Sequence, residues 1–136
     1  MKHLLTFLFL LIAATPSAQI VKILGDWTTI DDQINEPVSV VRIYRATNGK
    51  YYGRIDRITY PGYENALCKE CKGDLHNKPM KGMVIIYDMV YNEKKQRLEG
   101  GRVLDPNNGK YYHGAIWYDS KKGCLILRGS LDSRGI

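Results

Sequence analysis

Short runs of β-branched and aromatic residues recur along this chain of 136 residues, and Gly, Asn or Asp residues separate them. That alternation is typical of antiparallel strands joined by tight turns, whereas helical periodicity is weak after residue 19. We expect seven strands, over residues 24–29, 39–45, 51–58, 83–91, 96–104, 110–118 and 124–131. Local turns join them, apart from one long loop between the third and fourth strands. The pattern therefore predicts an all-β fold, an antiparallel up-and-down meander that closes into a barrel or a strongly curled sheet.

Turn residues mark where the chain should reverse. Asn48-Gly49 is the strongest short hairpin signal, and residues 105–109 read Asp-Pro-Asn-Asn-Gly, a turn in composition. The second segment resembles a calcium-binding loop only superficially, because it lacks acidic residues at alternate positions. Gly100-Gly101 inside the fifth predicted strand indicates a bulge or a sharp bend.

The N-terminus has the order of a secretory signal peptide. A short positive start precedes an apolar run over residues 4–14 and a small-residue stretch, with a cut expected after Ala18. The apolar run is too short to span a bilayer, and a buried N-terminal helix or strand is the alternative. We therefore expect a signal peptide over residues 1–18 and a single β-barrel domain over residues 19–136. The protein would then be exported, periplasmic or secreted.

Basic residues exceed acidic ones, for a formal net charge of +6. The two signs are interleaved along the chain, which is typical of a solvated surface. The more specific alternative is a weak attraction of the protein to an anionic surface, such as lipid or polysaccharide. The sequence contains no nucleic-acid-binding motif and, after residue 18, no apolar run of the length that a transmembrane segment needs.

The one long connection, residues 59–81, carries Cys68 and Cys71 in its middle. Loops of this length in a small domain are usually functional or tied down. In an exported protein a disulfide between such cysteines is the default, and it would pin a tight turn. Cys124, at the start of the last predicted strand, is expected as a buried free thiol, with pairing to a loop cysteine as the alternative.

Two other interpretations of the cysteine pair stay open. A redox-active pair would need Cys68 and Cys71 at the N-terminus of a helix, and no helix is predicted after them. A zinc site would use Cys68, Cys71 and His76, and Asp74 or His113 could be the fourth ligand. Zinc takes four such ligands at tetrahedral spacing, and the chain has no second cysteine pair.

Tyrosine is frequent, with ten in the chain, and most of them fall on predicted strands. Tyrosine fits a pleated, half-buried surface, so ordinary cross-strand packing is one interpretation and an aromatic-lined cavity is the other. The candidate ligand-binding residues are Tyr52, Tyr87, Tyr112 and Trp117. No catalytic residue is assigned, because the sequence has no nucleophile elbow, phosphate-binding loop or His-Glu-x-x-His motif.

Gly25-Asp26-Trp27 on the first predicted strand and Arg128 on the last one resemble the lipocalin and calycin pattern. The resemblance implies a barrel in which the Arg128 guanidinium lies over the indole of Trp27 and closes the base, a favourable cation–π contact. Gly25, Trp27 and Arg128 are therefore expected to be structural residues.

Four longer segments together resemble a narrower family, the exported bacterial proteins catalogued as domain of unknown function 2147. They are residues 25–32, 52–55, 68–74 and 100–112, which read GDWTTIDD, YGRI, CKECKGD and GGRVLDPNNGKYY. The resemblance covers residues 24–131 and implies an exported β-barrel-like domain with no assigned activity. Such proteins usually continue with a short final segment that bears Trp and Arg. Because this chain stops at Gly135-Ile136, we expect either a truncated chain or a barrel that closes without that strand, and a missing strand would leave an exposed edge.

These observations lead to three functional hypotheses. The first is an exported, lipocalin-like binding module that holds a small, partly apolar ligand or an envelope component and uses no cofactor. The second is an envelope enzyme that uses Cys68 and Cys71 for thiol or metal chemistry. The third is a purely structural envelope protein. An interior cavity would favour the first hypothesis, and a completely filled interior would contradict it.

Overall fold

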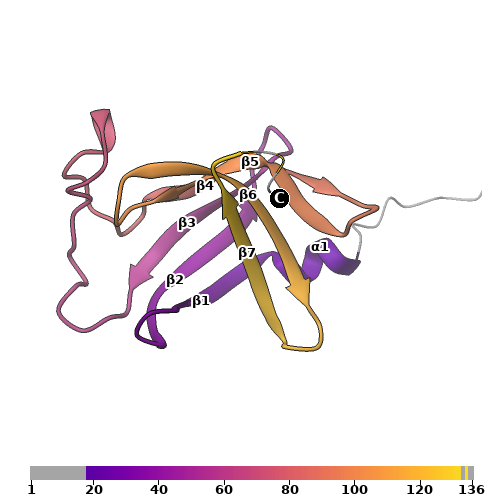
Figure 1. Ribbon diagram of the computed structural model, residues 1–136, viewed down its shortest axis with the longest axis horizontal. Coiled ribbons are helices and arrows are strands. Elements are labelled where there is room, and N and C mark those ends of the chain that lie inside the picture. The colour runs from indigo at the N-terminus through magenta and orange to yellow at the C-terminus, as the bar shows by residue number, and fades with distance from the viewer. Residues whose placement is uncertain (1–17, 133, 135–136) are drawn as a thin grey trace, which may run out of the picture.

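Seven antiparallel strands form a single sheet in which each strand pairs with its neighbours in sequence (Figure 1). The computed structural model describes residues 18–132 and residue 134. The strands are β1 (Gly25–Asp31), β2 (Glu36–Arg45), β3 (Tyr51–Ile58), β4 (Val84–Asn92), β5 (Arg97–Asp105), β6 (Lys110–Asp119) and β7 (Cys124–Ser130). The sheet curls into a barrel (Figure 1) that is only nearly closed, because within the described ranges β1 pairs only with β2 and β7 only with β6. The predicted all-β, up-and-down architecture is confirmed.

The seven strands lie where the hydrophobic pattern and the turn residues predict them. The largest difference is at the start of β2, which begins at Glu36 rather than at residue 39. Glu36 and Pro37 extend the first hairpin because they pair with Asp31 and Ile30. The predicted irregularity in β5 is also confirmed, since Gly100 has a φ of +81° and the register between β5 and β6 shifts there.

An N-terminal helix that the sequence pattern does not predict, α1 (Ala18–Ile23), closes one end of the barrel. Ile20 and Ile23 are buried in the main hydrophobic core together with apolar side chains from the strands. The Trp27 indole Nε1 donates a hydrogen bond of 2.8 Å to the Ile23 carbonyl oxygen. Because so short a helix is unstable alone, these contacts with the barrel must hold it in place.

The predicted signal peptide lies outside the described residues except for Ala18, with which α1 begins. The start of the mature domain at residue 19 therefore stays a prediction. No helix in the described part of the chain is long and apolar enough to cross a membrane.

Three glycines pair directly across the last three strands, Gly101 with Gly114 and Gly114 with Gly129. A Cβ atom at Gly101 would overlap the Tyr87 carbonyl oxygen, and one at Gly114 would lie 2.5 Å from Met89 Cε. The absent side chains let β4 and the core approach this part of the sheet closely. The row of glycines therefore allows the sheet to curl toward closure.

The expected contact between Arg128 and Trp27 is wrong for this chain. Trp27 packs against the core, and its ring centroid lies 6.3 Å from that of Tyr118. Tyr118 pairs with Leu125 on β7, and the side chains of both residues also pack against the core. Since successive side chains on a strand alternate between faces, Arg128 lies on the opposite face from Leu125, and it is exposed. The α1 helix holds the indole instead. Gly25 does have a structural role, because the chain passes from α1 into β1 through its φ of +113°.

Candidate functional site

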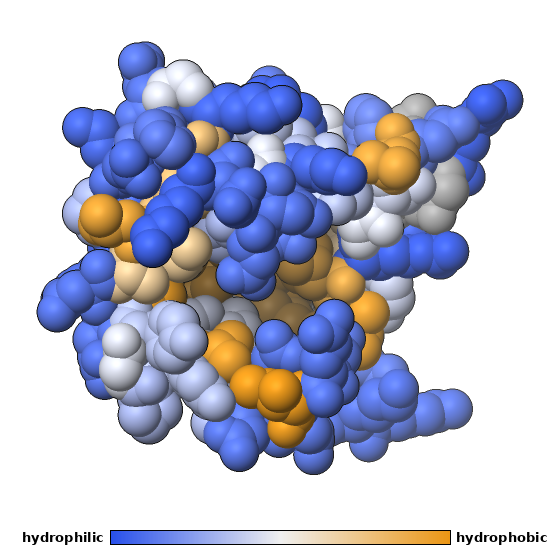
Figure 2. Space-filling view, turned by 60° about the vertical axis from the view of Figure 1, so that its left-hand side comes forward, coloured by the Kyte–Doolittle hydropathy of each residue, from blue (hydrophilic) through white to orange (hydrophobic). Residues whose placement is uncertain are grey.

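A cavity of about 760 Å³ opens as a hollow in Figure 2. The segments that line it lie at the end of the barrel opposite α1 (Figure 1). The β1–β2 hairpin and the end of β3 reach this end of the barrel, so Asp31, Ser39 and Ile58 line the cavity. The turn between β5 and β6 and the long loop of residues 59–83 complete its wall. Figure 2 shows a hollow with an apolar floor and a mostly hydrophilic surround.

The floor of the cavity is apolar. Its side chains come from β2, β3, β4 and the long loop and are Val38, Val41, Ile55, Ile58, Met80 and Ile85. Val41 and Ile55 also belong to the main core, so the floor is the open end of that core. Beside the floor, the hydroxyl groups of Thr29 and Ser39 form a hydrogen bond with each other, with their oxygens 2.6 Å apart. An apolar group could therefore lie on the floor without leaving these hydroxyls unpaired.

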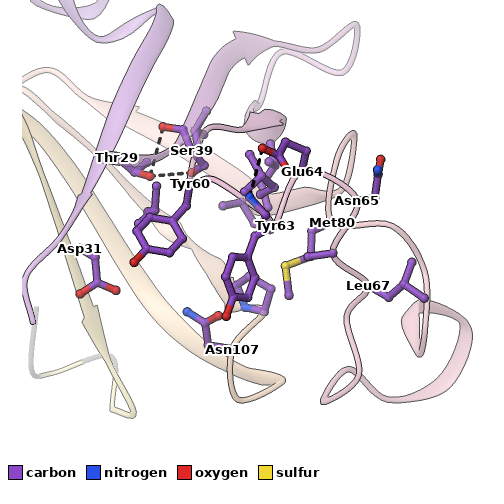
Figure 3. A pocket seen from close by; sticks show the side chains of 18 of the residues that line it. Thr29, Asp31, Ser39, Tyr60, Tyr63, Glu64, Asn65, Leu67, Met80 and Asn107 are labelled. Carbon is purple, nitrogen blue, oxygen red and sulfur yellow. Dashed lines mark hydrogen bonds between the residues drawn. The ribbon is translucent and has the colours of Figure 1, made fainter. Parts of the chain in front are cut away.

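A tight turn at Pro61-Gly62 places Tyr60 and Tyr63 at the mouth of the cavity (Figure 3). The Tyr63 backbone N–H donates to the Tyr60 carbonyl oxygen at 3.1 Å, and Gly62 has the φ of +86° that a type II turn requires. The turn brings the two ring centroids within 5.5 Å, with the planes inclined by 49°. Neither tyrosine is among the predicted ligand-binding residues, although the Pro-Gly pair between them is a readable turn signal.

Backbone hydrogen bonds hold the long loop beside the cavity. Its first residue, Thr59, donates to the Val38 carbonyl oxygen at 2.9 Å, which ties the loop to β2. Farther along, the Cys68 N–H donates to the Lys78 carbonyl oxygen at 2.8 Å, so the two halves of the loop bond to each other. The loop is therefore an ordered wall of the cavity.

Cys68 and Cys71 form the predicted disulfide, with Cα atoms 5.3 Å apart. Both side chains are buried, in a second hydrophobic cluster that includes Met83 and Leu104. Cys68 Sγ lies 3.3 Å from the carbonyl oxygen of Pro106, in the turn between β5 and β6. The disulfide therefore constrains the part of the long loop that packs against that turn, and both segments line the cavity.

Residues 25–135 match the model of a protein family described as "Uncharacterized protein conserved in bacteria (DUF2147)". The chain belongs to the DUF2147 family. The comparison with curated proteins finds no match. The family resemblance read from the sequence is confirmed.

A solved structure with the same architecture is protein HP1028 from Helicobacter pylori, which is described as belonging to the lipocalin family. Its TM-score with this DUF2147 protein is 0.68 at 25% sequence identity. The similarity covers 82% of this chain and 74% of that chain. Together with the seven-stranded, nearly closed barrel, it shows that the fold is lipocalin-like.

The zinc interpretation is wrong for this DUF2147 protein. Both loop cysteines are covalently paired, so neither sulfur is a thiolate that could bind the metal. The third proposed ligand, His76, has its Nδ1 3.1 Å from the Cys71 carbonyl oxygen. In the part of the chain that the structure describes, no cluster of three His, Cys, Asp or Glu side chains is arranged to hold a metal ion.

The two sulfurs on which the enzyme hypothesis depends are bonded to each other in this structure. With both sulfurs paired and buried, neither Cys68 nor Cys71 is a nucleophile in this structure. Cys124 remains a free thiol as predicted, but its side chain is half-buried rather than buried.

None of the four aromatic residues predicted to bind a ligand lines the cavity. The Tyr52 hydroxyl donates a hydrogen bond of 2.6 Å to Asp88, and this bond raises the pKa of Tyr52 above its usual value. Burial raises the pKa of Tyr87. Tyr112 and Trp117 are half-buried on β6. The aromatic side chains that line the cavity are those of Tyr60 and Tyr63 instead of these four.

Proposed function

We propose that this DUF2147 protein is a binding module that holds a small, partly apolar ligand in the cavity at the open end of its barrel. The observation that carries the proposal is the cavity itself, whose apolar floor is reached from solvent while the core fills the other end of the barrel. Its volume of about 760 Å³ lies within the range of roughly 300–1,000 Å³ that small-molecule pockets occupy. Burial of apolar ligand surface on the floor would favour binding.

The fold supports the same proposal. HP1028 is described as a lipocalin, and small barrels of this kind have room inside for one small ligand. The long loop, which contributes one wall, is the element that the sequence already marks as unusual in length. The ligand could be a free small molecule or a component of the cell envelope.

We also propose that the protein is exported, to the periplasm or beyond the cell. A buried disulfide is consistent with an oxidising compartment. The charge and hydropathy order of the first residues, typical of a signal peptide, supports the same location. The N-terminal residue of the protein isolated from its own cells tests this proposal. A mature chain that still carries residues 1–18 would contradict it.

Titration with the neutral, environment-sensitive dye N-phenyl-1-naphthylamine tests binding. The dye fluorescence should rise and saturate at one dye per protein. In Val38→Trp the larger side chain fills part of the cavity, so we expect the dye to bind about tenfold more weakly, or about 1.4 kcal/mol. The matched control is Val90→Trp, at an exposed strand position outside the cavity, which should bind as the wild type does. No saturable binding to the wild type, or equal affinity in the two variants, would contradict the proposal.

A further inference from the structure

We propose that the ligand is an amphiphile with a positively charged ammonium head group, which Tyr60, Tyr63 and Asp31 hold at the mouth of the cavity. Its apolar tail would lie on the floor described above. This inference rests on the proposed function, because it places the ligand in the same cavity. It adds the charge of the head group and the residues that recognise it.

The two tyrosine rings at the mouth suit a cation. The face of an aromatic ring attracts a cation, and two inclined rings can contact the same ammonium group. Tyr60 and Tyr63 are inclined by 49°, and the turn between them fixes that geometry. Other tyrosines already have a cation over the ring, namely Tyr118 with Lys22, Tyr51 with Arg45, Tyr44 with Arg54 and Tyr111 with Arg102. No Lys or Arg of the described ranges lies over Tyr60 or Tyr63, so a ligand can occupy that place.

Both tyrosine side chains are directed into the cavity, as Figure 3 shows. The Tyr60 hydroxyl points toward Asp31, and the Tyr63 hydroxyl points toward Asn107. All four residues line the cavity. The rings and the Asp31 carboxylate therefore face the same space, above the apolar floor.

The Asp31 carboxylate supplies negative charge at this place. Its Oδ1 accepts backbone hydrogen bonds from Gln33 at 2.8 Å and from Ile34 at 3.3 Å, which close the turn after β1. Asp31 forms no ion pair with a described residue, although the chain carries a net charge of +6. Asp26 on the same strand, by contrast, pairs with Arg42 at 2.7 Å. A half-buried carboxylate without a cation from the protein is suited to a cation from the ligand.

The other charged residues around the cavity point to the same head group. They are Glu64 and Lys69, so with Asp31 the lining carries two negative charges and one positive charge. Glu64 accepts the Gly62 N–H at 3.2 Å and, within the described ranges, has no ion-pair partner. A positively charged protein thus has a cavity mouth of opposite sign. An anionic head group would meet the exposed Glu64 carboxylate and the half-buried Asp31 carboxylate, and at Asp31 the repulsion is stronger than in bulk water.

Two amphiphiles with the same twelve-carbon tail separate the effect of the head group from that of the tail. Dodecyltrimethylammonium and dodecanoate, below their micelle concentrations at pH 7, each compete with bound N-phenyl-1-naphthylamine. We expect the ammonium compound to bind about tenfold more tightly than dodecanoate. Equal affinities, or tighter binding of dodecanoate, would overturn the inference and leave the proposed function intact. If the dye itself does not bind, both fail.

Asp31→Asn tests the carboxylate with little change to the turn, because the amide oxygen can still accept the two backbone hydrogen bonds. We expect the preference for the ammonium compound to fall roughly fivefold while the affinity for the neutral dye is unchanged. The neighbouring Asp32→Asn is the control, since Asp32 is exposed and outside the lining, and it should keep the wild-type preference. A wild-type preference in Asp31→Asn would count against the proposed role of the carboxylate.

Tyr60→Leu tests the ring. Leucine keeps an apolar side chain at the mouth but has no aromatic face for a cation. Affinity for dodecyltrimethylammonium should therefore fall several-fold more than affinity for dodecanoate. An equal loss for both amphiphiles would show that Tyr60 contributes only apolar surface and would overturn its assignment.

Discussion

A methyl group added at Gly109 should push the long loop away from the β5–β6 turn, and a matched position elsewhere in the chain provides the control. The sequence Asn-Gly-Lys-Tyr-Tyr occurs twice, over residues 48–52 and 108–112. Both turns have the same asparagine hydrogen bonds, and both glycines have a positive φ, +82° at Gly49 and +71° at Gly109. A Cβ atom at Gly109 would overlap the Glu70 carbonyl oxygen, whereas at Gly49 the nearest atom is a side-chain nitrogen 3.5 Å away.

The expected loss of stability follows from these surroundings. The left-handed backbone conformation costs an alanine roughly 1–2 kcal/mol, and this cost applies to Gly49→Ala and Gly109→Ala alike. Gly109→Ala must also displace Glu70 and the buried disulfide beside it, between Cys68 and Cys71. Exposure of those two side chains costs roughly another 2 kcal/mol. We therefore expect the free energy of unfolding to fall by about 1.5 kcal/mol in the control and about 3.5 kcal/mol in Gly109→Ala, which lowers the melting temperature by roughly 6 °C and 14 °C.

Urea unfolding measures the stability of both variants, and dye titration measures the cavity. Gly109→Ala should weaken the binding of N-phenyl-1-naphthylamine, because Lys69 and Pro106 lie next to the disturbed contact and line the cavity. Gly49→Ala lies in the β2–β3 turn, outside the lining, and should bind the dye as the wild type does. Equal losses of stability in the two variants would refute the argument that this contact holds the loop.

Two further predictions concern the disulfide and one carboxylate. Replacement of both Cys68 and Cys71 by serine should lower the free energy of unfolding by about 2 kcal/mol, because the disulfide restricts the unfolded chain by closing a small loop. The same replacement should weaken dye binding, and an unchanged dye affinity would contradict the inference that the disulfide positions the cavity wall. Hydrogen bonds from Asn92 at 2.7 Å and from Arg97 at 2.6 Å hold the pKa of Glu99 below its ordinary value. A lowered pKa stabilises the fold above the unfolded-state pKa, and that contribution is lost as the pH falls through the folded-state pKa. Between pH 6 and pH 3 the wild type should therefore lose more stability in urea unfolding than Glu99→Gln, and parallel losses would argue against this assignment.

The strand order could be predicted from the sequence because its signals are local. In an up-and-down barrel every pairing joins neighbours in the sequence, so the two-residue alternation and the turn residues of each hairpin are sufficient. The disulfide could be predicted for a similar reason, since its cysteines are three positions apart and depend on little beyond their own loop. The α1 helix could not, because six residues form a helix here only through the burial of Ile20 and Ile23.

The residues of the cavity could not be predicted one by one, because they depend on contacts between distant segments. Tyr60 and Tyr63 reach the mouth only because the long loop is tied back to β2 at Val38. The position of Tyr52 on a strand makes it a candidate for an aromatic-lined cavity, but its hydroxyl donates a hydrogen bond to Asp88 on β4 instead. Arg128 shows the same limit, since the face on which it lies depends on the register of β7.

The Cys-x-x-Cys segment and the Asp-Pro-Asn-Asn-Gly turn, which are far apart in the sequence, form one structural unit. Cys68 lies against Pro106. The Glu70 carbonyl oxygen, in the same loop segment, lies so close to Gly109 that a side chain at position 109 would overlap it. The cysteine sulfurs are paired and buried, so they offer the cavity no reactive group. The residues next to these contacts, Lys69 and Asn107, line the cavity instead. The disulfide and the turn therefore place the wall of the cavity, and in the proposed function the tyrosines and the carboxylate at its mouth would select the head group of the ligand.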